Sequence, residues 1–137
     1  MSSKDYPVSA SLGLLILRLG LGAMFIWHGY GKITGGPELW IKLGQATSVV
    51  GIHFAPKIFG FLAALSEFGG GICLVLGFLT RPAALMMAIT MTVATCMHLV
   101  HGDGLNVASH AIEVGIVFYS LILIGPGRFS FDAMRKG

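Results

Sequence analysis

Four stretches of about 20 mainly apolar residues dominate this 137-residue chain and limit what it can fold into. They cover residues 11–30, 58–79, 82–101 and 107–124. A helix needs roughly 20 apolar residues to cross the hydrocarbon core of a bilayer, and it satisfies its own backbone hydrogen bonds there. The sequence therefore predicts an all-α fold, a single four-helix transmembrane bundle over residues 1–137.

The composition excludes several other classes of protein. Only 11% of the residues are charged and 55% are hydrophobic, whereas a soluble domain has about 25% charged residues. The nine Lys and Arg residues are spread along the chain, and only Arg135 and Lys136 are adjacent, so no basic patch indicates a nucleic-acid partner. Cys73 and Cys96 both lie in apolar stretches, which argues against a disulfide framework. The expected surroundings are a lipid bilayer.

The connections between the stretches differ in length. Residues 31–57 place Leu39, Trp40 and Leu43 near helical spacing, which predicts a short interfacial helix with Trp40 as its anchor; an ordinary polar loop is the alternative. Residues 80–82 form a tight connection, with Pro82 suited to the first turn of the next helix.

Basic residues outside the four stretches predict the orientation. With four spans, one side holds both termini and Lys4, Arg81, Arg128, Arg135 and Lys136. The other side holds Lys32, Lys42 and Lys57. Because cytoplasmic loops carry an excess of Lys and Arg, this difference favours cytoplasmic termini.

Ionisable residues inside the four stretches are the candidate site residues, namely Arg18, His28, Glu67, His98, His110 and Glu113. Each costs roughly 2.5–3.5 kcal/mol on insertion scales and marks a potential functional site. At a rise of about 1.5 Å per residue, Glu67 and Glu113 lie at one depth, about 18 Å into the membrane. Arg18 lies about 10 Å in, and the histidines lie deeper than both carboxylates. The sequence predicts a polar column within the bundle.

Three interpretations of this column remain open. In a structural one, Arg18 pairs with Glu67 or Glu113 and fixes the helix register. In a redox or quinone-type site, the carboxylates and histidines move protons. A metal site made by His28, His98 and His110 is the third, although their spacing matches no specific ligand pattern.

Three longer motifs carry a resemblance to a known family. They are LRLGLGAMFIWHGYGKI at residues 17–33, SEFGGGICLVLGFLTRPAAL at 66–85 and LIGPGRFSFDAM at 123–134. The chain resembles the DoxX family of small bacterial four-helix membrane proteins. The matching residues are Arg18, His28, Lys32, Glu67 and Arg81. The resemblance implies a multi-pass protein of the bacterial cytoplasmic membrane, associated with quinone- or thiol-linked redox or oxidative-stress systems.

The first functional hypothesis is a polar intramembrane site in or beside such a redox system, together with a redox partner protein. Glu67 and Glu113 would accept protons, and Arg18 would compensate their charge. His28, His98 and His110 would shuttle protons or, together with Lys32, bind a ligand such as a quinone. The alternatives are a non-enzymatic subunit or scaffold and a small proton-coupled transporter, so enzymatic activity stays open. A small-residue face at Gly69, Cys73 and Gly77 permits a homodimer.

Overall fold

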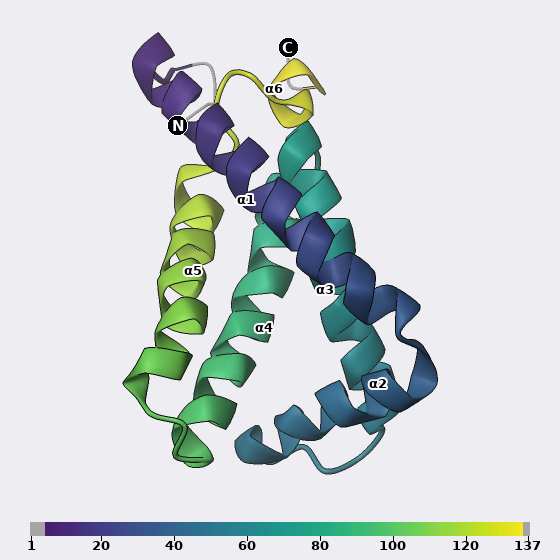
Figure 1. The fold of residues 1–137 in the computed structure, drawn as a ribbon. Helices are drawn as coiled ribbons and strands as arrows, with labels where there is room; N and C mark the ends of the chain where they lie inside the picture. Colours follow the sequence, from purple (N-terminus) through teal and green to yellow (C-terminus); the bar gives the residue numbers. More distant parts are fainter. Residues whose placement is uncertain (1–4, 136–137) are drawn as a thin grey trace.

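Residues 5–135 of the computed structural model are described, and they form helices only, with no strand (Figure 1). Four helices are long and apolar enough to cross a membrane: α1 (Val8–Thr34), α3 (Pro56–Leu76), α4 (Thr80–Val100) and α5 (Leu105–Ile124). Helix α2 (Gly36–Gly44) and the 3₁₀ helix η1 (Gln45–Val50) connect α1 to α3, and α6 (Phe131–Arg135) follows α5. The predicted all-α bundle with four spans is confirmed.

The turn between α3 and α4 lies earlier than the sequence predicts. Helix α3 ends at Leu76 because Gly77 has a φ of +66°, in the left-handed region that glycine adopts easily. Helix α4 already begins at Thr80, since the Asp132 carboxylate accepts hydrogen bonds of 2.9 Å from the backbone N–H groups of Leu79 and Thr80. A side chain near the far end of the sequence thus caps α4, and residues 80–82 belong to the helix.

The short helix predicted after the first span is confirmed, but α2 does more than lie at an interface. It crosses the end of the bundle opposite α6 (Figure 1) and packs closely on α3. A Cβ atom added to Gly60 would lie 1.6 Å from the Trp40 carbonyl oxygen, so only glycine permits this approach. The Trp40 indole packs edge-on against Phe61 at 4.9 Å between ring centroids, and its Nε1 donates to the Lys32 carbonyl. Helix α2 therefore fixes the end of α1 against α3.

Helices α1 and α3 touch through their backbones. A Cβ atom on Gly22 would lie 2.7 Å from the Gly71 carbonyl oxygen, and one on Gly29 would lie 2.4 Å from the Phe68 nitrogen. Small residues allow such close packing between membrane helices. Gly69 of the predicted small-residue face takes no part in this contact, since its added Cβ would approach only Leu65 of its own helix; a homodimer through that face stays a prediction.

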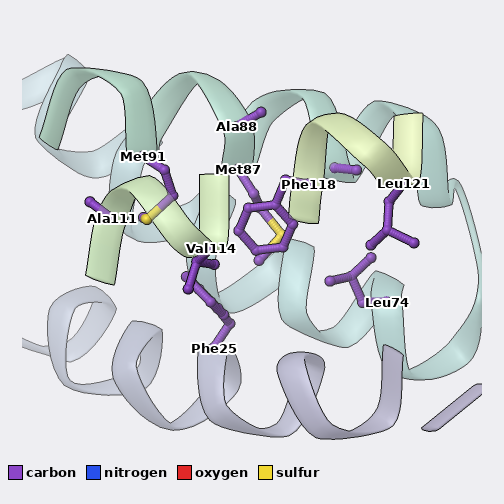
Figure 2. Packing of buried hydrophobic residues seen from close by; sticks show 10 residues of the cluster. Phe25, Leu74, Met87, Ala88, Met91, Ala111, Val114, Phe118 and Leu121 are labelled. Atoms are coloured by element: carbon purple, nitrogen blue, oxygen red, sulfur yellow. The ribbon is translucent and has the colours of Figure 1, made fainter. Parts of the chain in front are cut away.

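The apolar core joins the four spans near the middle of the bundle. Figure 2 shows Phe25 of α1 reaching Phe118 of α5, with Met87 of α4 beside the Phe118 ring. The two phenylalanine rings are 5.1 Å apart in an edge-to-face arrangement, which is a favoured geometry for aromatic pairs. Leu74 of α3 completes this core and is fully buried.

At the end of the bundle where α1 begins, the C-terminal segment folds back over the spans; we call residues 125–135 the C-terminal clasp. Arg18 is fully buried and donates from Nη1 to the Leu74 carbonyl at 3.2 Å and from Nη2 to the Phe129 carbonyl. Asp132 of the clasp also acts electrostatically on Arg18. One side chain of α1 thus holds both α3 and the clasp.

The close α1–α3 contact predicts different effects for two neighbouring glycines. Replacing Gly29 by Ala should destabilise the protein by about 1–3 kcal/mol, because the new methyl group forces the helices apart. Replacing Gly31 by Ala is the matched control, since no atom lies within 4 Å of its added Cβ; this change should be neutral or stabilising by up to about 1 kcal/mol. Thermal unfolding in detergent, followed by circular dichroism, measures both, and equal effects would contradict the packing.

Candidate functional site

The most deeply placed ion pair of the described chain joins α1 to α3. The Lys32 ammonium lies 2.8 Å from Oε1 and 2.7 Å from Oε2 of Glu67. Glu67 lies near the middle of α3, about 15 Å from either end, and only 4% of its side chain is exposed. Lys32 keeps 35% of its side chain exposed. The Lys32 ammonium is thus a charged, partly exposed hydrogen-bond donor beside a buried carboxylate.

Local packing brings these two residues together. Gly29 lies on the α1 face that touches α3 beside Phe68, the residue after Glu67. Lys32 follows three positions later on α1, so its side chain projects from the neighbouring turn. The hydrogen bond from Trp40 to the Lys32 carbonyl fixes the backbone at this point. The glycine contact and α2 therefore set the geometry of the pair.

The structural interpretation that pairs Arg18 with Glu67 or Glu113 is wrong. Arg18 donates to backbone carbonyls at the clasp end of the bundle, whereas Glu67 is neutralised by Lys32. The predicted first span ends at residue 30, which leaves Lys32 in the connection after it. In the structure α1 continues to Thr34, which brings Lys32 into the bundle.

His28 and His110 face each other across α1 and α5. Their ring centroids are 6.5 Å apart, and His28 also lies edge-on to Phe25 at 6.5 Å. Both histidines are exposed in the single chain. Since His28 precedes Lys32 by four residues, the two side chains lie on one face of α1, a turn apart. The structure thus groups His28, His110, Lys32 and Glu67 toward the α2 end of the bundle.

His98 and Glu113 form no hydrogen bond or ion pair with these four residues, although Glu113 lies one turn from His110 on α5. His98 binds Asp103 through Nδ1 at 2.8 Å, near the turn between α4 and α5. Glu113 is exposed on α5 and has no hydrogen bond or ion pair with any residue between 5 and 135. Within that part of the chain, no group of three or more His, Cys, Asp or Glu residues could hold a metal ion. His28, His98 and His110 are therefore not brought together as one ligand set.

The sequence did not predict the partners of two carboxylates. Asp132 caps α4 and Asp103 binds His98, yet both lie outside the four apolar stretches that contain the candidate site residues. Asp103 lies five residues after His98 in a short turn, a spacing that could have indicated the contact. Nothing local to Asp132 indicates its partners, which lie more than 50 residues earlier in the chain.

Comparison with known proteins agrees with this architecture. The family model described as DoxX matches residues 13–102, well over half of the chain. The chain belongs to the DoxX family. The match includes most of α1, all of α3 and α4, the ion pair and Arg18, whereas α5 and the clasp lie beyond it.

Two bacterial proteins are similar to this DoxX protein along most of their length. The "Inner membrane protein YqjF" of Escherichia coli (strain K12) is 33% identical over 126 residues, covering 90% of this chain and 92% of the relative. An "Uncharacterized protein" of Haemophilus influenzae is 28% identical over 139 residues, covering 97% and 89% respectively. No solved structure matches. Together with the four spans, the Escherichia coli relative confirms the predicted localisation, the bacterial inner membrane.

A double-mutant cycle tests the assignment of the ion pair. Lys32→Met alone should destabilise the protein by up to about 3 kcal/mol, because it leaves the Glu67 carboxylate buried without a counter-charge. Adding Glu67→Gln should recover much of that loss, so the two substitutions are coupled. Arg18→Met combined with Glu67→Gln should instead be additive. Unfolding free energies in mixed micelles measure both cycles, and coupling to Arg18 rather than Lys32 would refute the assignment.

Proposed function

We propose that this DoxX protein acts in a quinone-linked redox system and binds the quinone head group beside the Lys32–Glu67 pair. One observation carries the proposal. Lys32 neutralises a buried carboxylate while about a third of its own side chain remains exposed, so it can also contact a ligand. Intramembrane charges of this kind commonly mark substrate or proton pathways.

The hydrogen-bonding capacity of Lys32 supports this role. An ammonium group has three N–H donors, and Glu67 accepts through both of its oxygens. A third donor is left for an acceptor such as a quinone carbonyl oxygen. An apolar ring with carbonyl acceptors fits a membrane site of this composition better than a charged, water-soluble substrate does.

The neighbouring residues suit proton exchange with such a ligand. Reduction of a quinone to a quinol consumes two electrons and two protons. His28 lies one turn from Lys32 and faces His110, and an imidazole ring carries one nitrogen that donates and one that accepts a proton. Glu67 would hold the ammonium in place and exchange a proton with it. The electrons would come from a partner oxidoreductase, which remains part of the proposal.

A quinone-linked role has more support than a thiol-linked one. Cys73 of α3 and Cys96 of α4 are both free cysteines, and the sequence contains no CxxC motif for dithiol exchange. Arg18 has no part in this proposal, since it is fully buried and its Nη1 and Nη2 donate to α3 and the clasp. His98 and Glu113 lie apart from the pair and are likewise not assigned to it.

The proposed orientation keeps the termini in the cytoplasm. Arg81, Arg128 and Arg135 lie at the clasp end, whereas Lys32 is engaged by Glu67 and no longer counts as a loop charge. Lys4 and Lys136 lie outside the described residues. The clasp end still has more basic residues than the opposite end, which favours a cytoplasmic clasp end.

A fluorescent protein that folds only in the cytoplasm tests this orientation. Fused to the C-terminus, it should fluoresce; a fusion that is fully expressed but dark would show the opposite orientation.

Tryptophan fluorescence offers a direct binding test. In a Trp27→Phe variant, Trp40 is the one remaining tryptophan, and its indole is hydrogen-bonded to the Lys32 carbonyl. Titration of a short-chain quinone into nanodiscs should quench Trp40 in a saturable manner. Lys32→Met should weaken the binding at least about tenfold, as expected for loss of a hydrogen bond to a charged donor.

The control is Glu38→Gln, which neutralises an exposed carboxylate of α2 and should leave the quinone affinity unchanged. Quenching that rises linearly with quinone concentration, or that is equal in wild type and in Lys32→Met, would show that quinone only partitions into lipid near Trp40. Either result would refute the proposed function.

A further inference from the structure

Helix α5 carries a row of polar side chains, most of which are exposed in the single chain. Asn106, His110, Glu113 and Ser120 are separated by four, three and seven residues; we call them the polar stripe of α5. Asn106, His110 and Glu113 are exposed and Ser120 is half-buried. Positions separated by three, four and seven residues share one helix face. A polar face on a membrane span is a feature that the bundle itself does not explain.

Glu113 is the decisive member of the stripe. It lies about 12 Å along α5 from its first residue, within the span rather than at its end. Its side chain has no hydrogen bond or ion pair with the described residues, in contrast to Glu67, which has Lys32. Carboxylates inside membrane spans almost always have a partner, so the surface around Glu113 requires one.

We propose that a second copy of this chain packs on the polar stripe, with the two α5 helices parallel around a two-fold axis along the membrane normal. His110 and Glu113 lie about 4.5 Å apart along the helix axis. A two-fold interface brings the same surface of both copies together, so residue i contacts j and j contacts i. Each His110 can therefore donate to Glu113 of the second copy, which gives two equivalent hydrogen bonds.

The stripe fits a second copy because it is complementary to itself. It contains one carboxylate acceptor and one imidazole donor, and its spacing of three and four residues is typical of two helices that cross at a small angle. His110 also faces His28 within its own chain at 6.5 Å. The carboxylate of the second copy would then extend the His28–His110 pair. This interface does not depend on the proposed quinone site.

Cysteine crosslinking in native membranes tests the interface. In a background with Cys73→Ala and Cys96→Ala, the substitution Ser120→Cys places one thiol on the stripe. Mild oxidation should give a covalent dimer in high yield. The control is Ile89→Cys, an exposed position of α4 away from the stripe, which should stay monomeric. No dimer at position 120, or equal yields at both positions, would overturn the proposal.

The substitution Glu113→Leu separates a dimer from a lipid-exposed monomer. If Glu113 binds His110 of a second copy, its loss should weaken dimerisation about ninefold, because two hydrogen bonds worth about threefold each are lost. The yield of the Ser120→Cys dimer should fall accordingly, and Glu113→Gln should give an intermediate yield because its amide still accepts a hydrogen bond. An unchanged yield with Glu113→Leu would show that Glu113 does not contact a second copy.

Discussion

A carboxylate buried within a membrane helix requires a counter-charge, and the arrangement of α1, α2 and α3 supplies one to Glu67. Backbone contact at Gly29 brings α1 against α3, and α2 fixes the end of α1 through Trp40. These contacts place the Lys32 ammonium at 2.7–2.8 Å from both carboxylate oxygens. The glycine packing, the short helix and the ion pair thus depend on one another.

The two ends of the bundle use charge differently. At the clasp end, Arg18 is fully buried and its guanidinium binds backbone carbonyls, so it joins structural elements and leaves little for a ligand. At the opposite end, Lys32 is partly exposed and His28 lies one turn away. This difference separates a structural cation from one that can also take part in binding. Arg18 and Lys32 are both basic residues of α1, but their surroundings give them different roles.

The sequence predicted the four spans well because hydropathy over 20 residues depends little on the partners of each helix. It predicted the helix ends less well, since Thr80 begins α4 through a cap from Asp132, 52 residues later. The partner of Glu67 was missed for a related reason. Depth along a helix can be counted from the sequence, but the direction in which a side chain points across the bundle depends on packing. Arg18 and Glu67 lie at different depths in the bundle, and their side chains do not face each other.

Dipolar recoupling by solid-state NMR, with the protein in lipid bilayers, tests the central claim most directly. With ¹⁵N in the lysine side chains and ¹³C in the glutamate carboxyl groups, strong dephasing should show that the Lys32 Nζ lies within hydrogen-bonding distance of the Glu67 carboxylate. This dephasing should vanish in Lys32→Met and persist in Arg18→Met. Absence of the coupling in the wild-type protein, or its loss in Arg18→Met alone, would contradict the account.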